Sequence, residues 1–152
     1  MVNKLEKIYT EDNLDIYFVK TDEKRKDTSD VLKNIYKNLG EEILIVRAKY
    51  HRPKNVKSKY NYSITYVNDG AFIAFGKGNF AIDAEEIRPY DKNINKILKI
   101  KPKDEKEFFE FFTQKEALIK LNDLMLTNIL DNLNGKVKSI SYKNYIISIA
   151  KS

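Results

Sequence analysis

The strongest indication of the fold comes from residues 60–83, YNYSITYVNDGAFIAFGKGNFAID. Aromatic and β-branched residues dominate 60–67 and alternate with polar ones, which predicts a strand. The Asn68-Asp69-Gly70 sequence is a strong hairpin-turn signal, and the apolar run 71–75 predicts the returning strand. A second turn at 76–79 leads into a third short strand at 80–83. The stretch therefore predicts a β-hairpin followed by a third short strand.

Further elements are expected on both sides of this stretch. Two more strands are predicted, at 14–20 and 42–48, and a charged loop at 21–29 precedes a predicted helix at 30–39 that ends before Gly40. A helix is predicted at 104–112, followed by a second helix or its continuation at 113–121. Strands at 136–142 and 145–150 predict a closing hairpin. Because strands and helices mix without a regular βαβ alternation, the expected fold class is α+β.

Composition excludes several classes of function. The chain has 152 residues, with 28 Lys and Arg against 22 Asp and Glu, one His and no Cys. A disulfide framework, a thiolate zinc site and a cysteine nucleophile are therefore ruled out. The apolar runs are too short to span a membrane, and the first residues lack the apolar core of a secretory signal, so we expect a cytoplasmic protein without a membrane partner. The net charge of +6 permits a polyanionic partner.

Two segments carry side chains suited to phosphate chemistry. Asp83 and Glu85 are two residues apart, so on a strand both carboxylates leave the same face. Glu116 and Lys120 are four apart and share one face of a helix. If that helix packs across the end of the strand, three carboxylates and one ammonium converge. Three hard oxygen ligands would hold Mg²⁺, which completes its coordination with water and phosphate oxygens.

Each feature also has an ordinary structural interpretation. Residues 113–116 (TQKE) match a helix capping box, with Thr113 as the N-cap. Glu116 and Lys120 match a surface ion pair, worth roughly 0.3–0.5 kcal/mol. Asp83 and Glu85 would also suit the solvated edge of a strand. The phenylalanines of 108–112 (FFEFF) are expected in the core rather than in a partner groove.

The order of these segments resembles the 4′-phosphopantetheinyl transferase superfamily, in particular its Sfp-like branch. The family signature is a Gly-Ile-Asp-x-Glu strand followed by a (Trp/Phe)-(Ser/Thr)-x-Lys-Glu-(Ala/Ser)-x-x-Lys helix. Here the two parts read AIDAE at 81–85 and FTQKEALIK at 112–120. Upstream, NYSIT at 61–65 resembles the family's Asn-x-Ser-His-Ser strand, with Ile64 in place of the His. YHRPK at 50–54 resembles the Gly-Lys-Pro motif, and NYII at 144–147 the closing strand.

The resemblance implies transfer of the 4′-phosphopantetheine arm of coenzyme A to a serine of an apo acyl or peptidyl carrier protein. The other product is adenosine 3′,5′-bisphosphate. By similarity, Mg²⁺ would bind Asp83, Glu85 and Glu116. Glu116 would take the serine proton, and Lys120 would neutralise the pyrophosphate. The remaining contacts to coenzyme A would come from Arg52, Ser63, Thr65 and Lys115.

The resemblance also implies an architecture. A single domain, 1–152, would contain two small lobes related by a pseudo-twofold axis. The first lobe, about 1–69, would be reduced, and the second would cover about 70–152. Coenzyme A would bind in the cleft between them. An acidic carrier protein would be attracted by the positive net charge.

Two other functions stay open. One is a non-catalytic relative that binds a carrier protein or a nucleotide. The other is a small basic nucleic-acid-binding module, which is the less expected partner because no recognised motif supports it. It would use the six cations of the run 47–59, which no acid interrupts before Asn68, with Tyr50, Tyr60 and Tyr62 as stacking platforms.

Overall fold

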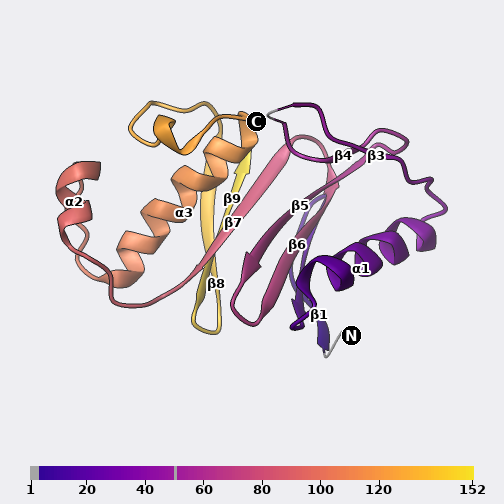
Figure 1. The fold of residues 1–152 in the computed structure, drawn as a ribbon, viewed down its shortest axis with the longest axis horizontal. Coiled ribbons are helices and arrows are strands. Elements are labelled where there is room, and N and C mark those ends of the chain that lie inside the picture. The colour runs from indigo at the N-terminus through magenta and orange to yellow at the C-terminus, as the bar shows by residue number, and fades with distance from the viewer. Residues whose placement is uncertain (1–3, 50) are drawn as a thin grey trace. The chain divides into compact units, whose positions relative to one another are not determined.

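The computed structural model describes residues 4–49 and 51–152, and the chain divides into two compact units, Met1–Phe80 (unit 1) and Ala81–Ser152 (unit 2). The strands are β1 (Lys4–Glu11), β2 (Leu14–Lys20), β3 (Ile45–Val46), β4 (Lys54–Asn55), β5 (Tyr60–Val67), β6 (Gly70–Lys77), β7 (Phe80–Glu86), β8 (Lys136–Tyr142) and β9 (Tyr145–Lys151). The helices are α1 (Lys24–Asn38), α2 (Asn93–Leu98), α3 (Glu105–Leu121) and the 3₁₀ turn η1 (Leu126–Asn128). Figure 1 shows these elements along the chain.

Unit 1 is built on a four-stranded antiparallel sheet in the order β1-β2-β6-β5. One face of this sheet packs against α1 through a core that contains Val31, Leu32 and Tyr36 from the helix. The β5–β6 hairpin is the one that the 60–75 stretch predicts, with Val67 paired to Gly70 across the turn. Glycine is required at Gly76, because an added Cβ would lie 1.9 Å from the Asn13 carbonyl oxygen.

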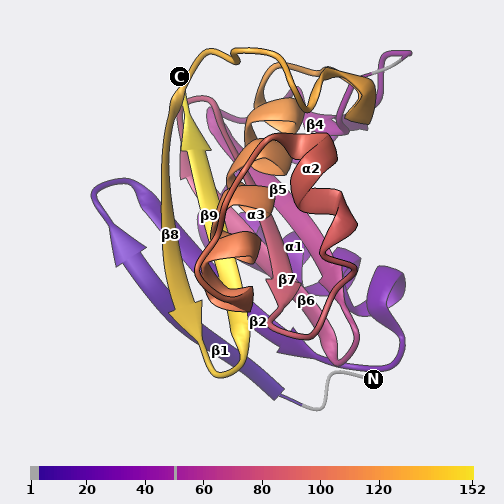
Figure 2. The same cartoon turned by 90° about the vertical axis from the view of Figure 1, so that its left-hand side faces the viewer.

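Unit 2 has a three-stranded sheet in the order β7-β9-β8, and β8 and β9 form the predicted closing hairpin. Figure 2 shows α3 lying along this sheet. Small residues let the helix approach closely: Ala81, Ala117 and Ala150 share one core cluster with Leu118 and Leu121. A second cluster contains Phe108 and Phe109, which confirms the core interpretation of the phenylalanine-rich stretch.

The two units repeat one topology. In unit 1, β2 is followed by α1 and then by the β5–β6 hairpin, whose second strand pairs with β2. In unit 2, β7 is followed by α2 and α3 and then by the β8–β9 hairpin, whose second strand is the neighbour of β7. Each unit therefore places its last strand in the middle of the same three-strand pattern. Unit 1 adds β1 at the sheet edge and the β3–β4 ribbon.

Several sequence predictions need correction. Helix α1 begins at Lys24, inside the predicted loop 21–29, where Asp27 and Thr28 are buried and Asp27 Oδ2 accepts a hydrogen bond from Thr21 Oγ1. The predicted strand 42–48 is reduced to Ile45–Val46, which pairs with β4.

The lobe boundaries also change. The first unit ends at Phe80 rather than near residue 69, because β6 pairs with both β2 and β5. Unit 1 carries a four-stranded sheet and unit 2 a three-stranded one, and the expected reduction of the first lobe stays a prediction. The alternative of one continuous helix over 104–121 is confirmed by α3. No helix in the described part of the chain is long and apolar enough to cross a membrane.

Candidate functional site

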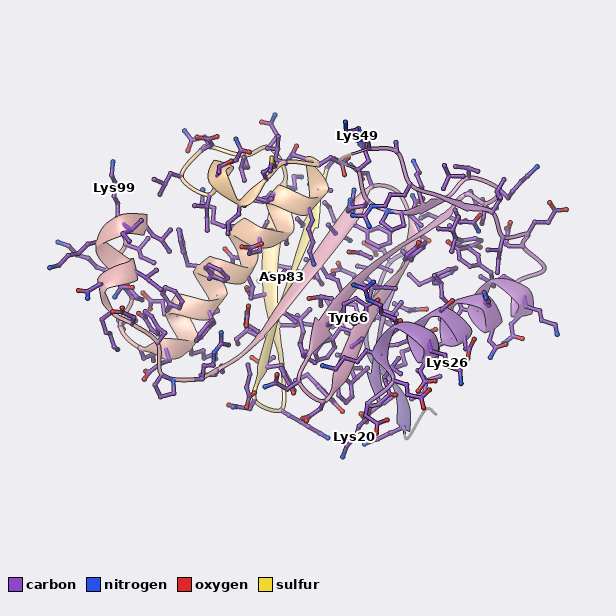
Figure 3. The ribbon with its side chains drawn as sticks, in the orientation of Figure 1. Lys20, Lys26, Lys49, Tyr66, Asp83 and Lys99 are labelled. Carbon is purple, nitrogen blue, oxygen red and sulfur yellow. The ribbon has the colours of Figure 1, made fainter. Side chains whose placement is uncertain are left out.

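Strand β7 and helix α3 bring Asp83 and Lys120 together within unit 2. The Lys120 Nζ atom lies 3.4 Å from Asp83 Oδ1 and donates a hydrogen bond to the Ile82 carbonyl oxygen at 3.0 Å. Asp83 is buried, and the Lys120 side chain is about three-tenths exposed. Figure 3 shows Asp83 where β7 passes α3. The ammonium group therefore contacts both the carboxylate and the backbone of the strand that carries it.

The local sequence explains how α3 holds Lys120 in this place. Asp104 caps the helix, because its Oδ1 accepts a hydrogen bond from the Glu107 amide at 2.8 Å. Seventeen residues without Gly or Pro continue the helix to Leu121. Ala117 is fully buried against the core of unit 2, and this contact leaves Glu116 and Lys120 on the flank of the helix. Both are half-buried.

The carboxylates around Asp83 influence one another. Burial raises the pKa of Asp83 to about 6; Lys120 opposes the shift, and the charges of Glu116 and Glu85 add to it. Burial also raises the pKa of Glu116, again with a contribution from Glu85 and against the effect of Lys120. Like charges raise each other's pKa values only at short range. Asp83, Glu85 and Glu116 therefore form one electrostatic group.

The carboxylates of Asp83, Glu85 and Glu116 are not arranged around a single metal position in this structure. Among residues 4–49 and 51–152, no three Asp, Glu or His side chains are placed together as ligands of one ion. Lys120 lies at Asp83, and Glu85 Oε2 accepts a hydrogen bond from Arg88 at 2.9 Å. By donor chemistry the set fits Mg²⁺, which prefers carboxylate oxygens, and a cation would relieve the mutual repulsion. The side-chain positions would have to adjust to close around it.

The capping-box interpretation of 113–116 is wrong, because Thr113 lies in the middle of α3 and is fully buried. Its hydroxyl donates to the Phe109 carbonyl at 2.6 Å and lies 2.6 Å from the Ser148 hydroxyl. Ser148 in turn lies 2.7 Å from Ser139 Oγ, which accepts a hydrogen bond from Gln114. This chain of polar groups links α3 to β9 and β8. The sequence contains one signal for this chain of polar groups, a lone Ser within the apolar run 145–150.

Lys115 lies away from this group of charges. Its ammonium donates a hydrogen bond to the Asp131 carbonyl at 2.9 Å, in the loop that follows η1. The expected contact of Lys115 with phosphate stays a prediction.

The other expected contacts for coenzyme A belong to unit 1. Arg52 donates to the Phe80 carbonyl at 2.8 Å and to Asn79 Oδ1 at 3.3 Å, so its guanidinium braces the turn before β7. Ser63 and Thr65 share one face of β5, as the alternation predicts, but this polar face is the more buried one. Their phosphate contacts stay predictions. Tyr50, part of the 50–54 motif, lies outside the described residues.

The stacking platforms of the nucleic-acid alternative are partly engaged within unit 1. The Tyr60 ring stacks on Phe75, with 5.4 Å between centroids and 14° between the planes. Tyr62 is half-buried and packs against the core beside α1, and this burial raises its pKa. Neither ring offers two open faces to a nucleobase. Tyr50, the third platform, is not among the described residues.

Comparison with known proteins adds no relative to this picture. Neither the models of known protein families nor the curated proteins include a match to this sequence.

Proposed function

We propose that this protein transfers the 4′-phosphopantetheine group of coenzyme A to a serine of an apo acyl or peptidyl carrier protein. The observation that carries the proposal is the meeting of Asp83 on β7 with Lys120 on α3, inside an electrostatic group that includes Glu85 and Glu116. These four residues are the ones that the family resemblance assigns to metal and pyrophosphate. The topology repeated in the two units also agrees with the two-lobed fold that the resemblance implies.

In this proposal each residue has a chemical role. Glu116 accepts the proton of the carrier serine, and its raised pKa makes the carboxylate a better base near neutral pH. The serine oxygen bonds to the phosphorus on the pantetheine side, the pyrophosphate P–O bond breaks, and adenosine 3′,5′-bisphosphate leaves. Lys120 stabilises negative charge on the leaving phosphate.

The proposal assigns Mg²⁺ to Asp83, Glu85 and Glu116. When bound there, the ion would supply positive charge against the pyrophosphate and orient its oxygens. No other cofactor is needed, because phosphoryl transfer depends mainly on positioning and electrostatic stabilisation.

Intact-protein mass spectrometry tests the proposal. Apo carrier proteins of several kinds are incubated with this protein, coenzyme A and Mg²⁺, and we expect the mass of a phosphopantetheinyl group to be added. The gain should disappear with EDTA and in the variants Glu116→Gln and Asp83→Asn. Glu110→Gln is the matched control, since Glu110 is a half-buried acid on the same helix outside this group. No mass gain with any carrier protein would contradict the proposal.

A non-catalytic relative is the second candidate function. The favouring observation is that Lys120 already neutralises Asp83, and that the described acids form no three-ligand set. Such a protein would bind coenzyme A or a carrier protein without transferring the group. Calorimetric titration with coenzyme A separates the two functions, because binding without any mass gain on the carrier supports only the second.

A further inference from the structure

The β3–β4 ribbon of unit 1 exposes an unusual run of apolar side chains. The exposed fractions of Leu44, Ile45, Val46 and Val56 are 48%, 42%, 46% and 55%. Ile43 precedes them in the sequence and is also exposed. The sequence pattern of 42–48 is that of a buried strand, but within the described residues β3 and β4 form a separate two-stranded sheet. Adjacent exposed apolar residues of this kind mark a binding surface.

Hydrogen bonds from a buried side chain fix the conformation of the ribbon. Asn55 is buried, and its Oδ1 accepts hydrogen bonds from the amides of Leu44 and Lys57 at 2.9 and 3.1 Å. Its Nδ2 donates to the Glu42 carbonyl at 3.0 Å. One side chain thus fixes both strands of the ribbon. Figure 1 shows the ribbon above α1, in the upper part of unit 1.

Positive charge follows these apolar side chains along the chain, whereas two acids, Glu41 and Glu42, precede them. Arg47, Lys54, Lys57 and Lys59 are exposed, and no acid occurs from residue 47 to residue 68. Lys54 is the cross-strand partner of Val46, so a cation and an apolar side chain lie side by side on one face. A partner that combines negative charge with an apolar interior would match the cations and the apolar side chains together.

The shape of the ribbon distinguishes between an acidic protein and an anionic membrane surface. Ile45 and Val46 are successive residues of one strand, so their side chains point to opposite faces. Both are exposed. A protein surface would cover one face, whereas lipid head groups and acyl chains surround an inserted ribbon on all sides. We propose that the β3–β4 ribbon inserts its apolar side chains into the interface of an anionic lipid bilayer, with the neighbouring cations on the head groups.

This association requires no membrane-spanning segment and does not rest on the proposed transferase activity. It is tested by co-sedimentation of the full chain with two kinds of vesicle. One is phosphatidylcholine alone, and the other is an equal mixture of phosphatidylcholine and phosphatidylglycerol. We expect binding to the mixed vesicles that weakens as salt is added.

Two double variants separate the charge from the apolar contribution. Lys54→Gln with Lys57→Gln should weaken binding to the mixed vesicles about 25-fold, since each lysine near an anionic surface contributes about a fivefold factor. Leu44→Ser with Ile45→Ser should weaken it about tenfold or more. Circular dichroism verifies that both variants fold.

Matched controls come from unit 2. Lys99→Gln with Lys101→Gln removes the same charge, and Figure 3 shows Lys99 extending away from α2. Ile97→Ser removes an apolar side chain that is 66% exposed. Both controls should bind as the wild type does.

Three outcomes would overturn the proposal. The first is no binding to mixed vesicles. The second is binding that depends on the lysines but not on Leu44 and Ile45, because this is adsorption by charge alone. The third is retention by an acidic apo carrier protein, dependent on Leu44 and Ile45, without vesicle binding, because the ribbon would then dock on a protein.

Discussion

A single ammonium group joins α3 to β7: Lys120 Nζ lies 3.4 Å from Asp83 Oδ1 and 3.0 Å from the carbonyl oxygen of Ile82. The pair is mostly shielded from water, so its partners depend on each other. Removing the charge of either residue destabilises the folded protein, because the remaining buried charge then has no partner to offset the free energy of its desolvation.

The variant Lys120→Met should lose about 1–3 kcal/mol in the free energy of unfolding at pH 8. The loss should be smaller at pH 5, because Asp83 is then largely protonated and needs no counter-charge. Adding Asp83→Asn should recover part of the pH 8 loss. Urea unfolding at both pH values measures these differences, and an equal loss at both would contradict the coupling.

The stability difference between Asp83→Asn and the wild type should depend on pH. The folded-state pKa of Asp83, about 6, lies above its ordinary value of 3.8, so the folded protein binds this proton more tightly than the unfolded chain. The tighter proton binding adds to the free energy of unfolding; this gain is fully present below about pH 4 and is lost as the pH rises through about 6. The total loss of unfolding free energy across this range is at most about 3 kcal/mol.

The Asn variant lacks this titration. Its stability relative to the wild type should therefore increase between pH 4 and pH 7, and thermal unfolding at several pH values measures the trend. Glu110→Gln serves as the control for a general effect of removing a carboxylate from this unit. A constant difference across the range would contradict the assigned pKa.

Magnesium should stabilise the wild type if Asp83, Glu85 and Glu116 bind it. At a concentration about 100 times the dissociation constant, the gain would be about 2.7 kcal/mol. Asp83→Asn and Glu116→Gln should show much smaller gains, and Glu110→Gln the full one. Thermal unfolding with Mg²⁺ or with EDTA measures the effect. Equal gains in all four proteins would place the ion elsewhere.

The polar chain between α3 and β9 should contribute as a unit. Thr113→Val removes the hydroxyl next to Ser148 and should cost about 1–3 kcal/mol, because a buried polar group loses a hydrogen-bond partner. The double variant Thr113→Val with Ser148→Ala should cost less than the sum of the two single changes. A double-mutant cycle by urea unfolding tests this, and additive losses would show that the two hydroxyls are independent.

Gly76→Ala should destabilise unit 1 severely, by more than about 3 kcal/mol, because the new Cβ would overlap the Asn13 carbonyl oxygen. Gly78→Ala is the matched control. No atom lies within 4 Å of the new Cβ at this position, so the positive φ of 90° is the only source of strain there. We expect a loss of about 1 kcal/mol in the free energy of unfolding. Circular dichroism during thermal unfolding measures both changes. Similar losses would contradict the steric explanation.

Local patterns predicted the elements that alternate strongly or carry turn signals. The strands 14–20 and 60–67 have the bounds that their residues indicate, and the closing hairpin differs from its predicted bounds by one residue, Lys151. The apolar periodicity did not predict the start of a helix whose first turns bury polar side chains. Helix α1 begins in the charged segment 21–29, which has buried Asp27 and Thr28 rather than an apolar stripe.

Residue patterns were enough to predict the mixed α and β character and the relative spacing of Asp83, Glu85, Glu116 and Lys120, because spacing on a strand or helix follows from backbone geometry. The contact of Lys120 with Asp83 rather than with solvent could not be predicted in this way, since it depends on the packing of α3 against β7 through Ala81 and Ala117. Only the tertiary structure shows that the apolar run 43–46 is exposed. Whether a segment is buried depends on which other parts of the chain pack against it, and the local sequence pattern does not specify those contacts.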